Sequence, residues 1–118
     1  MNTIFIHDLR VETRIGVYDW EQHLRQTLRL DLEIECPSDA AFRSDHFADA
    51  LDYSAVVSRL QALAADHPHK LMERFAEAIA DVLLGEFHAP SVKVRVAKLA
   101  PIAGVKELAV AIERRRAA

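Results

Sequence analysis

The chain has 118 residues, of which 51% are hydrophobic and 28% are charged, and its net charge at pH 7 is −3. These values predict a single globular domain over residues 1–118, and they give no electrostatic case for binding nucleic acid. No stretch approaches the roughly 20 apolar residues of a membrane helix, and the first residues lack the features of a signal peptide. The single cysteine, Cys36, cannot form a disulfide within the chain, so we expect a reducing compartment, the cytoplasm.

Residues 3–17 are predicted to form a long first strand, because apolar side chains recur at alternate positions. The apolar positions are even at Ile4 and Ile6 but odd from Leu9 onward. A change of phase inside a strand requires an extra residue or a bend. We therefore predict a β-bulge or kink near His7 and Asp8.

A second strand is predicted from Gln26 to Glu35, where apolar residues at even positions alternate with charged residues at odd positions. Two long strands joined by one loop predict an antiparallel pair. The loop, residues 15–22, contains the only tryptophan, Trp20, together with a tyrosine and two acidic residues. Loops on a rigid scaffold often carry binding groups, although Trp20 could instead simply cover the end of the core.

Two amphipathic helices are predicted next, over residues 53 to about 66 and residues 71 to about 86. Asp52 or Ser54 can cap the first helix. No side chain close before Leu71 can cap the second helix, so its first amides need other partners. A loop group or water is the ordinary partner, and a ligand oxygen is the alternative.

Apolar residues at even positions from Val92 to Val96 predict a third strand, and those from Leu108 to Ile112 predict a fourth. The order ββααββ predicts an α+β fold, with a four-stranded antiparallel sheet and two helices on one face. The other face is polar, and two edge strands remain unpaired. We therefore predict an oligomer whose edges join into a closed ring around a wet tunnel.

Lys98 is the sharpest candidate for chemistry, because the even phase of the third strand places it on the apolar side of the sheet. It either reaches solvent at the strand end or lies in a pocket, where it could donate and accept protons. Glu73 complements the dipole of the second helix, and that role alone would explain it. Taken singly, Tyr53 and Glu21 carry no clear indication of function.

The six histidines do not predict a metal site. His67 and His69 are two residues apart, and no third ligand stands at a typical spacing. The chain has only three glycines and no phosphate-binding loop. We therefore predict neither a metal nor another cofactor.

Several motifs together make this sequence similar to the dihydroneopterin aldolase family over nearly its full length. They are Ile15–Glu21 (IGVYDWE), Leu51–Tyr53 (LDY), Leu71–Glu77 (LMERFAE), Lys98, and Val110–Arg114 (VAIER). The resemblance implies the tunnelling fold, in which four ββααββ subunits close a barrel and two barrels stack as a homo-octamer. It also implies active sites between neighbouring subunits.

The resemblance further implies a folate-biosynthesis reaction, in which 7,8-dihydroneopterin is split into 6-hydroxymethyl-7,8-dihydropterin and glycolaldehyde. Epimerisation of the side-chain carbon C2′ generally accompanies it. This retro-aldol needs a base, an acid and an electron sink. The C=N bond of the pterin can be the sink, so neither a metal nor a Schiff base is required.

The resemblance also implies a role for five residues. Lys98 matches the catalytic general acid/base, acting with water. Glu73 matches the acid that binds the guanidine-like edge of the pterin, and Met72 matches the position whose backbone amide helps to hold it. Tyr53 matches a tyrosine that reaches in from the adjacent subunit to sandwich the ring and handle protons. Glu21 matches the acid that positions the substrate side chain and the lysine.

One residue departs from the family pattern. The catalytic lysine is commonly followed by proline, and here it is followed by Leu99, as in the related dihydroneopterin triphosphate 2′-epimerase. The loop of residues 15–21 favours the aldolase, and the epimerase is kept as the alternative. A pterin-binding ring protein without catalysis is the alternative from a different class.

Overall fold

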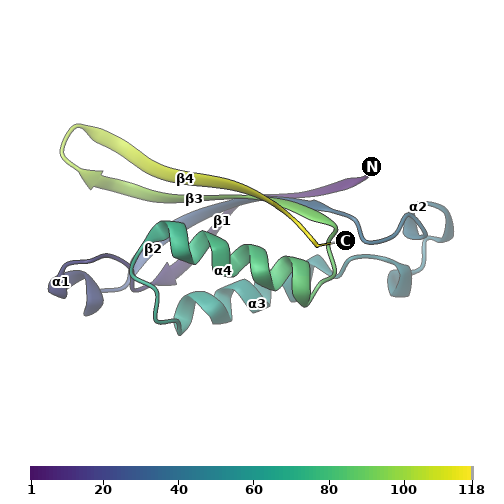
Figure 1. Ribbon diagram of the computed structural model, residues 1–118, viewed down its shortest axis with the longest axis horizontal. Helices are drawn as coiled ribbons and strands as arrows, with labels where there is room; N and C mark the ends of the chain where they lie inside the picture. The colour runs from purple at the N-terminus through teal and green to yellow at the C-terminus, as the bar shows by residue number, and fades with distance from the viewer. Residues whose placement is uncertain (118) are drawn as a thin grey trace.

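The computed structural model describes residues 1–117, and of Ala100 only the backbone. The elements are β1 (Thr3–Thr13), α1 (Asp19–Gln22), β2 (Gln26–Glu35), α2 (Ala41–Ser44), the 3-10 helix η1 (Phe47–Asp49), α3 (Tyr53–Ala65), α4 (Met72–Gly85), β3 (Ser91–Ile102) and β4 (Val105–Arg115). Within residues 1–117 the four strands form one antiparallel sheet in the order β1-β2-β3-β4. The long helices α3 and α4 cover one face of it (Figure 1). The predicted α+β arrangement ββααββ is confirmed.

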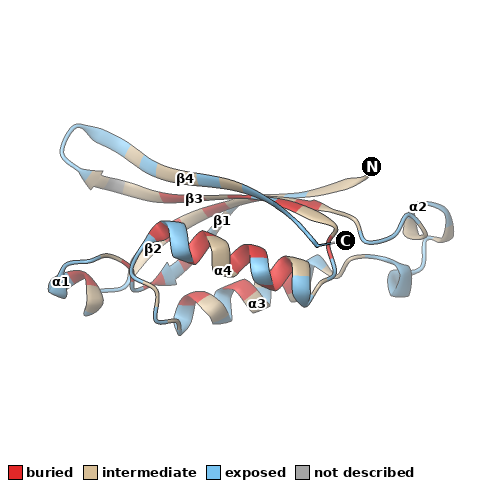
Figure 2. Cartoon of the chain, in the orientation of Figure 1, coloured by how far each residue is buried: buried red, intermediate tan, exposed pale blue. Residues whose placement is uncertain are grey.

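The core lies between this helix layer and the sheet. Leu28, Leu30 and Leu32 of β2 are completely buried, and Phe75 of α4 is buried against the same layer. Figure 2 shows the buried positions gathered in β2, β3 and α4, while α2 has none and the tip of the β3–β4 hairpin is exposed. The alternation read from the sequence therefore identifies the buried face, because side chains of a strand point to opposite sides in turn.

The predicted irregularity in the first strand is confirmed. The pairing of β1 with β2 shifts register between Ile6 and Leu9. Asp8 has a φ of 56°, a left-handed conformation that aspartate adopts more readily than most residues. Its backbone N–H donates to Asp31 Oδ1 at 2.9 Å. The bulge lets both apolar phases of β1 face the core.

The predicted end of the first strand is wrong. We expected it to reach residue 17, but β1 ends at Thr13 and the chain then turns toward the helix layer. Gly16 has a φ of 128°, and its N–H donates to the carbonyl of Lys70 at 2.8 Å. Ile15 is nevertheless buried, with 1% of its surface exposed. The alternation thus predicted burial correctly beyond the point where the strand pairing stops.

The two long helices lie within one residue of their predicted bounds. Asp52 caps α3, since its Oδ1 accepts from the Ala55 N–H at 3.1 Å. Helix α4 begins after Leu71, whose side chain makes no capping hydrogen bond. The short elements α1, α2 and η1 were not predicted, because three or four residues carry no periodic pattern. Within residues 1–117, every helix is too short or too polar to cross a membrane.

The sheet is longer than the helix layer that covers it. The β3–β4 hairpin and α1 project at one end of the molecule, and α2 projects at the other, beside both chain ends (Figure 1). β1 and β4 are the outer strands of the sheet. The projecting hairpin, α1 and the start of α4 meet at the same end, and there they enclose the candidate site.

Candidate active site

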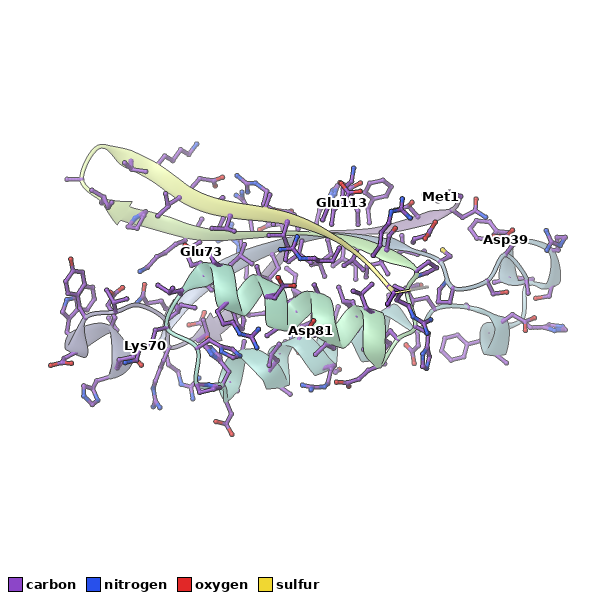
Figure 3. All side chains as sticks on the ribbon, viewed as in Figure 1. Met1, Asp39, Lys70, Glu73, Asp81 and Glu113 are labelled. Carbon is purple, nitrogen blue, oxygen red and sulfur yellow. The ribbon has the colours of Figure 1, made fainter. Side chains whose placement is uncertain are left out.

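A hollow lies where the loop of residues 15–21, the start of α4 and the β3–β4 hairpin converge. Four of the five sequence-predicted site residues line it: Glu21, Met72, Glu73 and Lys98. Trp20 and apolar side chains of the hairpin complete its walls. Figure 3 shows Lys70 and Glu73 at this end, where α4 begins. Segments far apart in the sequence thus line one hollow.

Lys98 lies in this hollow and does not reach out to bulk solvent. In the sheet it pairs with Leu28 of β2 and Leu108 of β4, which sets its side chain on the helix-facing side. Its Nζ lies 2.5 Å from Oε2 of Glu21, and only 17% of the Lys98 side chain is exposed. Of the two alternatives left open by the sequence, the structure selects the pocket.

Glu21 is the most buried charged residue of the site, with 4% of its surface exposed. Gln26 Nε2 donates to its Oε2 at 3.3 Å, and the Tyr18 N–H donates to its Oε1 at 3.4 Å. Burial pushes the pKa of the Glu21 carboxyl upward, but the hydrogen bonds from Lys98, Gln26 and the Tyr18 N–H, together with the charge of Lys98, outweigh it. The pKa therefore lies below its ordinary value of 4.5, and Glu21 is a carboxylate at neutral pH.

Gly16 makes room for this carboxylate. A Cβ on Gly16 would overlap the carboxyl group of Glu21, and the φ of 128° also disfavours any side chain. The Gln22 side-chain amide donates to the Gly16 carbonyl, which holds the turn against α1. The sequence pattern identified this loop but did not indicate that a glycine contacts the acid.

The start of α4 presents a second polar surface to the hollow. The first amides of a helix have no partners within the helix, and they attract electronegative groups. Leu71 cannot cap them, and Met72 and Glu73 both line the hollow. Glu73 is exposed, so its carboxylate is accessible to a ligand. This end of α4 can therefore offer donors and an acceptor side by side.

Tyr53 does not lie with the other four predicted residues. It begins α3, and it lines a separate hollow with Phe42 and Cys36 near α2. Its surface is 58% exposed. Within one chain, Tyr53 therefore cannot take part in the site around Lys98.

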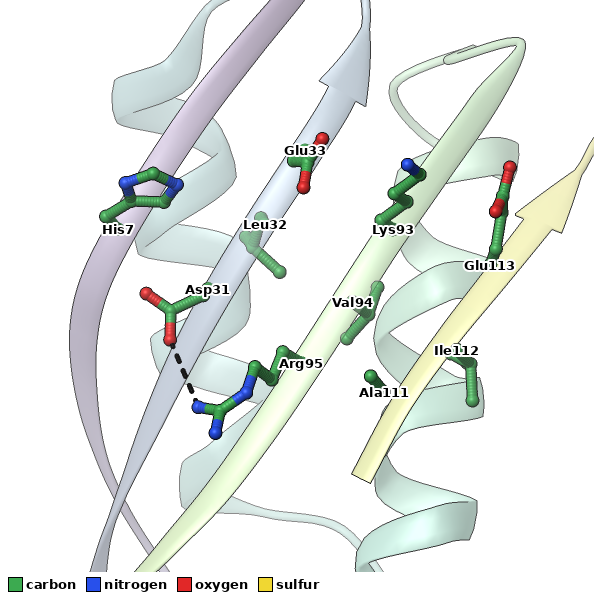
Figure 4. Close-up of a pocket in the computed structure, with 10 residues that line it drawn as sticks. All are labelled: His7, Asp31, Leu32, Glu33, Lys93, Val94, Arg95, Ala111, Ile112 and Glu113. Carbon is green, nitrogen blue, oxygen red and sulfur yellow. Dashed lines mark ion pairs between the residues drawn. The ribbon is translucent and has the colours of Figure 1, made fainter. Parts of the chain in front are cut away.

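Another hollow lies on the sheet face that the helices leave open. Figure 4 shows its charged residues of both signs, including Lys93, Glu33 and Glu113, with Arg95 paired to Asp31 at 3.8 Å. Both hollows measure about 380 Å³, so size does not distinguish them. Of these two hollows, it is the one beside Lys98 that combines a buried acid–base pair with aromatic and aliphatic walls, which suit a flat ring. Among the described residues, no group of three or more metal-binding side chains is close enough to hold an ion.

A buried lysine–glutamate pair that opens onto a small hollow is an arrangement typical of enzymes that transfer protons on small molecules. Comparison with known proteins specifies the family. The FolB family model, described as dihydroneopterin aldolase, matches residues 4–113. The chain belongs to the dihydroneopterin aldolase family.

Individual relatives agree over nearly their whole length. Dihydroneopterin aldolase of Escherichia coli (strain K12) is 37% identical over 97% of this chain and 93% of its own. A FolB crystal structure from Vibrio cholerae has a TM-score of 0.93 and 40% identity over 98% of both chains. The Escherichia coli dihydroneopterin aldolase in complex with neopterin has a TM-score of 0.90 and 37% identity over 97% of this chain and 99% of that one.

Lys98→Met should raise the pKa of Glu21 above its ordinary value of 4.5, because the carboxyl stays buried while its strongest partner is lost. In the wild type, the low pKa stabilises the fold above pH 4.5, and this contribution is lost as the pH falls through the lowered pKa. In Lys98→Met the sign reverses, so stability is lost as the pH rises through the raised pKa. Carboxyl NMR titration and urea unfolding against pH measure both effects. Lys93→Met, on the opposite face of the sheet, should change neither quantity. An unchanged pKa of Glu21 in Lys98→Met would contradict the pairing of Glu21 with Lys98.

Gly16→Ala should separate Glu21 from Lys98, because the new methyl group needs the space of the carboxyl. Gly104→Ala is a matched control, since Gly104 has a φ of 87° but nothing within 4 Å of its Cβ position. Both variants should lose about 1–3 kcal/mol of unfolding free energy through backbone strain. Only Gly16→Ala should raise the pKa of Glu21. An equal pKa of Glu21 in the two variants would show that Gly16 is needed only for its backbone conformation and not to make room for the carboxyl.

Proposed function

We propose that this chain is a dihydroneopterin aldolase, which splits 7,8-dihydroneopterin into 6-hydroxymethyl-7,8-dihydropterin and glycolaldehyde. The observation that carries the proposal is the buried Lys98–Glu21 pair, at 2.5 Å, opening onto a hollow beside the uncapped start of α4. Membership of the family and the neopterin complex of the Escherichia coli relative support the substrate class.

In the proposed reaction, Lys98 handles the protons. A base removes the proton of the C2′ hydroxyl, the C1′–C2′ bond breaks, and its electrons move into the C=N bond of the dihydropterin. The resulting enamine takes a proton at C1′, while glycolaldehyde leaves. Lys98, with water, can serve as donor and acceptor in turn, because Glu21 holds its amine in the hollow.

The start of α4 is proposed to bind the pterin ring. The carboxylate of Glu73 can accept two parallel N–H···O bonds from the guanidine-like edge of the ring, which fixes orientation as well as affinity. The backbone amide at Met72 belongs to the first turn, where helix amides lack intrahelical partners. A pterin carbonyl bound there would supply the partner that Leu71 cannot.

Tyr53 is proposed to complete the site of a neighbouring subunit in a ring. Exposed apolar side chains cluster at both ends of the molecule. They include Trp20, Ile102 and Leu108 at the Lys98 end, and Phe42, Phe47 and Tyr53 at the other. A heterologous contact between the two different ends forms a ring where the rotation from subunit to subunit closes. Such a ring would bring Tyr53 to Lys98 of the next subunit, and two stacked rings of four would give the expected octamer.

The triphosphate 2′-epimerase is the alternative that Leu99 favours. The charged residues that line the hollow are Lys70, Lys98, Glu21 and Glu73, so their charges cancel. A triphosphate carries several negative charges and calls for an excess of cationic groups. The neutral balance supports the unphosphorylated substrate. Epimerisation of dihydroneopterin itself is proposed as a side activity, since recombination of enamine and aldehyde can invert C2′.

Lys98→Ala should lower kcat by about 10²–10⁴-fold, the usual contribution of a general acid/base, and leave pterin affinity within about threefold. Lys93→Ala, with a lysine from the same strand on the opposite face, is the matched control and should turn over normally. Glycolaldehyde release from free and from phosphorylated substrate measures the activity and distinguishes the aldolase from the epimerase. Undiminished turnover in Lys98→Ala would show that Lys98 is not a catalytic residue. If the wild-type protein binds pterin but does not turn it over, the result would favour the non-catalytic ring protein.

Glu73→Gln should weaken pterin binding by about 10–100-fold, because a charge-assisted pair is replaced by a neutral amide that meets an N–H donor edge. The rate of bond cleavage at saturating substrate should fall much less. Asp81→Asn, further along the same exposed side of α4, should bind normally. Fluorescence titration and single-turnover kinetics separate the two quantities. Normal affinity in Glu73→Gln would count against Glu73 as the pterin anchor.

Mixing two inactive variants tests the shared site. Tyr53→Phe and Lys98→Ala each impair every site of a homo-oligomer. When both are expressed in one cell, about a quarter of the shared sites receive Lys98 from one subunit and Tyr53 from its neighbour. Activity should therefore return to that fraction. No recovery in mixed rings, verified by differently tagged subunits, would place both residues outside a common site.

A further inference from the structure

His67, in the segment between α3 and α4, joins three parts of the molecule. Its Nε2 lies 2.6 Å from Oγ1 of Thr13, which ends β1 and is completely buried. Its Nδ1 accepts from the backbone N–H of His69 at 3.0 Å. Its ring packs on Phe75 of α4, with centroids 4.7 Å apart. The proposed chemistry uses none of these contacts.

The contacts define the protonation state of the ring. Because Nδ1 accepts a hydrogen bond, it carries no proton, so the neutral ring must carry its proton on Nε2. Nε2 therefore donates to Thr13 Oγ1. A second proton could only bind at Nδ1, where it would face the N–H of His69. Protonation is thus incompatible with the observed hydrogen bond.

The same segment leads directly into the candidate site. The next carbonyl after His69, that of Lys70, accepts from the Gly16 N–H at 2.8 Å, and Gly16 packs on Glu21. Two residues further, Met72 begins α4. The segment from His67 to Lys70 therefore fixes the turn that holds Glu21 and the start of α4 that faces the hollow.

We propose that His67 is a positioning residue: its neutral ring holds the loop before α4 in place, and its protonation loosens that loop and weakens pterin binding in mild acid. The effect on pterin rests on the proposed function, whereas the effect on the loop does not. Cytosolic acidification would thus lower substrate affinity without any change in the residues that touch the substrate.

The surroundings of the ring support this sensitivity. Burial lowers the pKa of His67 below its ordinary value of 6.5, the charge of His69 lowers it further, and Asp66 opposes them. Arg14, which directly follows β1, lines the same small hollow. α3 and α4 contribute Ala64, Ala65 and Phe75, which carry no charge. The folded state therefore loses stability as the pH falls from 6.5 through the lowered pKa.

His67→Gln provides the decisive variant, because its amide can accept from His69 and donate to Thr13 but does not titrate. In the full-length wild type, KM for dihydroneopterin should rise roughly tenfold between pH 7.5 and pH 5, with kcat changing less. In His67→Gln this rise should be absent, with KM at pH 7.5 within about twofold of wild type. His67→Ala should bind about tenfold more weakly at every pH. Thr13→Val, which removes the partner oxygen, gives the same test if His67→Ala does not fold.

Amide hydrogen exchange of Gly16, measured without ligand, gives an independent readout. The quantity compared is the protection factor of Gly16, the intrinsic exchange rate divided by the observed rate at the same pH. In the wild type this factor should be lower at pH 5 than at pH 7.5. In His67→Gln it should not change. Equal KM profiles and equal Gly16 exchange in the two proteins would overturn the proposal. If the wild type does not act on dihydroneopterin at all, the proposed function fails, and Gly16 exchange alone still decides whether His67 controls the loop.

Discussion

The buried pair of Lys98 and Glu21 is the interaction on which the rest of the site depends. Removing a carboxylate from water costs several kcal/mol unless a nearby charge and well-placed hydrogen bonds offset the loss. Here Lys98 supplies the charge at 2.5 Å, and Gln26 and the Tyr18 amide supply the remaining donors. The turn at Gly16 adopts a conformation that leaves room for this carboxylate. Loss of either partner leaves the other buried without its opposite charge, which costs free energy or shifts its pKa.

Two glutamates face the same hollow in different environments, and this difference supports the separate roles proposed for them. Glu21 is buried and paired within the chain, so its carboxylate is committed to Lys98. Glu73 is exposed in the first turn of a helix whose cap is missing, so its carboxylate can meet a ligand. In the proposed function, one acid can thus orient the amine of Lys98 and the other can bind a substrate edge, because their burial and partners differ.

Much of this arrangement could be predicted from periodicity. The two-residue period located β2 to the residue, revealed the bulge at Asp8 through a change of phase, and placed Lys98 on the inner face. Periodicity failed where contacts between distant segments decide the conformation. The turn after Thr13 is set by Gly16 bonding to Lys70, and the burial of Glu21 follows from that turn. A single acid in a polar loop gives no local indication of either.

The positions of the two apolar ends limit how such a chain can assemble. A contact that joins each end to its own copy would leave Tyr53 far from Lys98, because these residues lie at opposite ends of the molecule. A heterologous contact that joins unlike ends forms a ring where the rotation closes. The outer strands β1 and β4 run along the sides of the sheet and not at its ends (Figure 1), so covering the sheet edges is a separate requirement on assembly. The role proposed for Tyr53 requires only that unlike ends of two subunits meet.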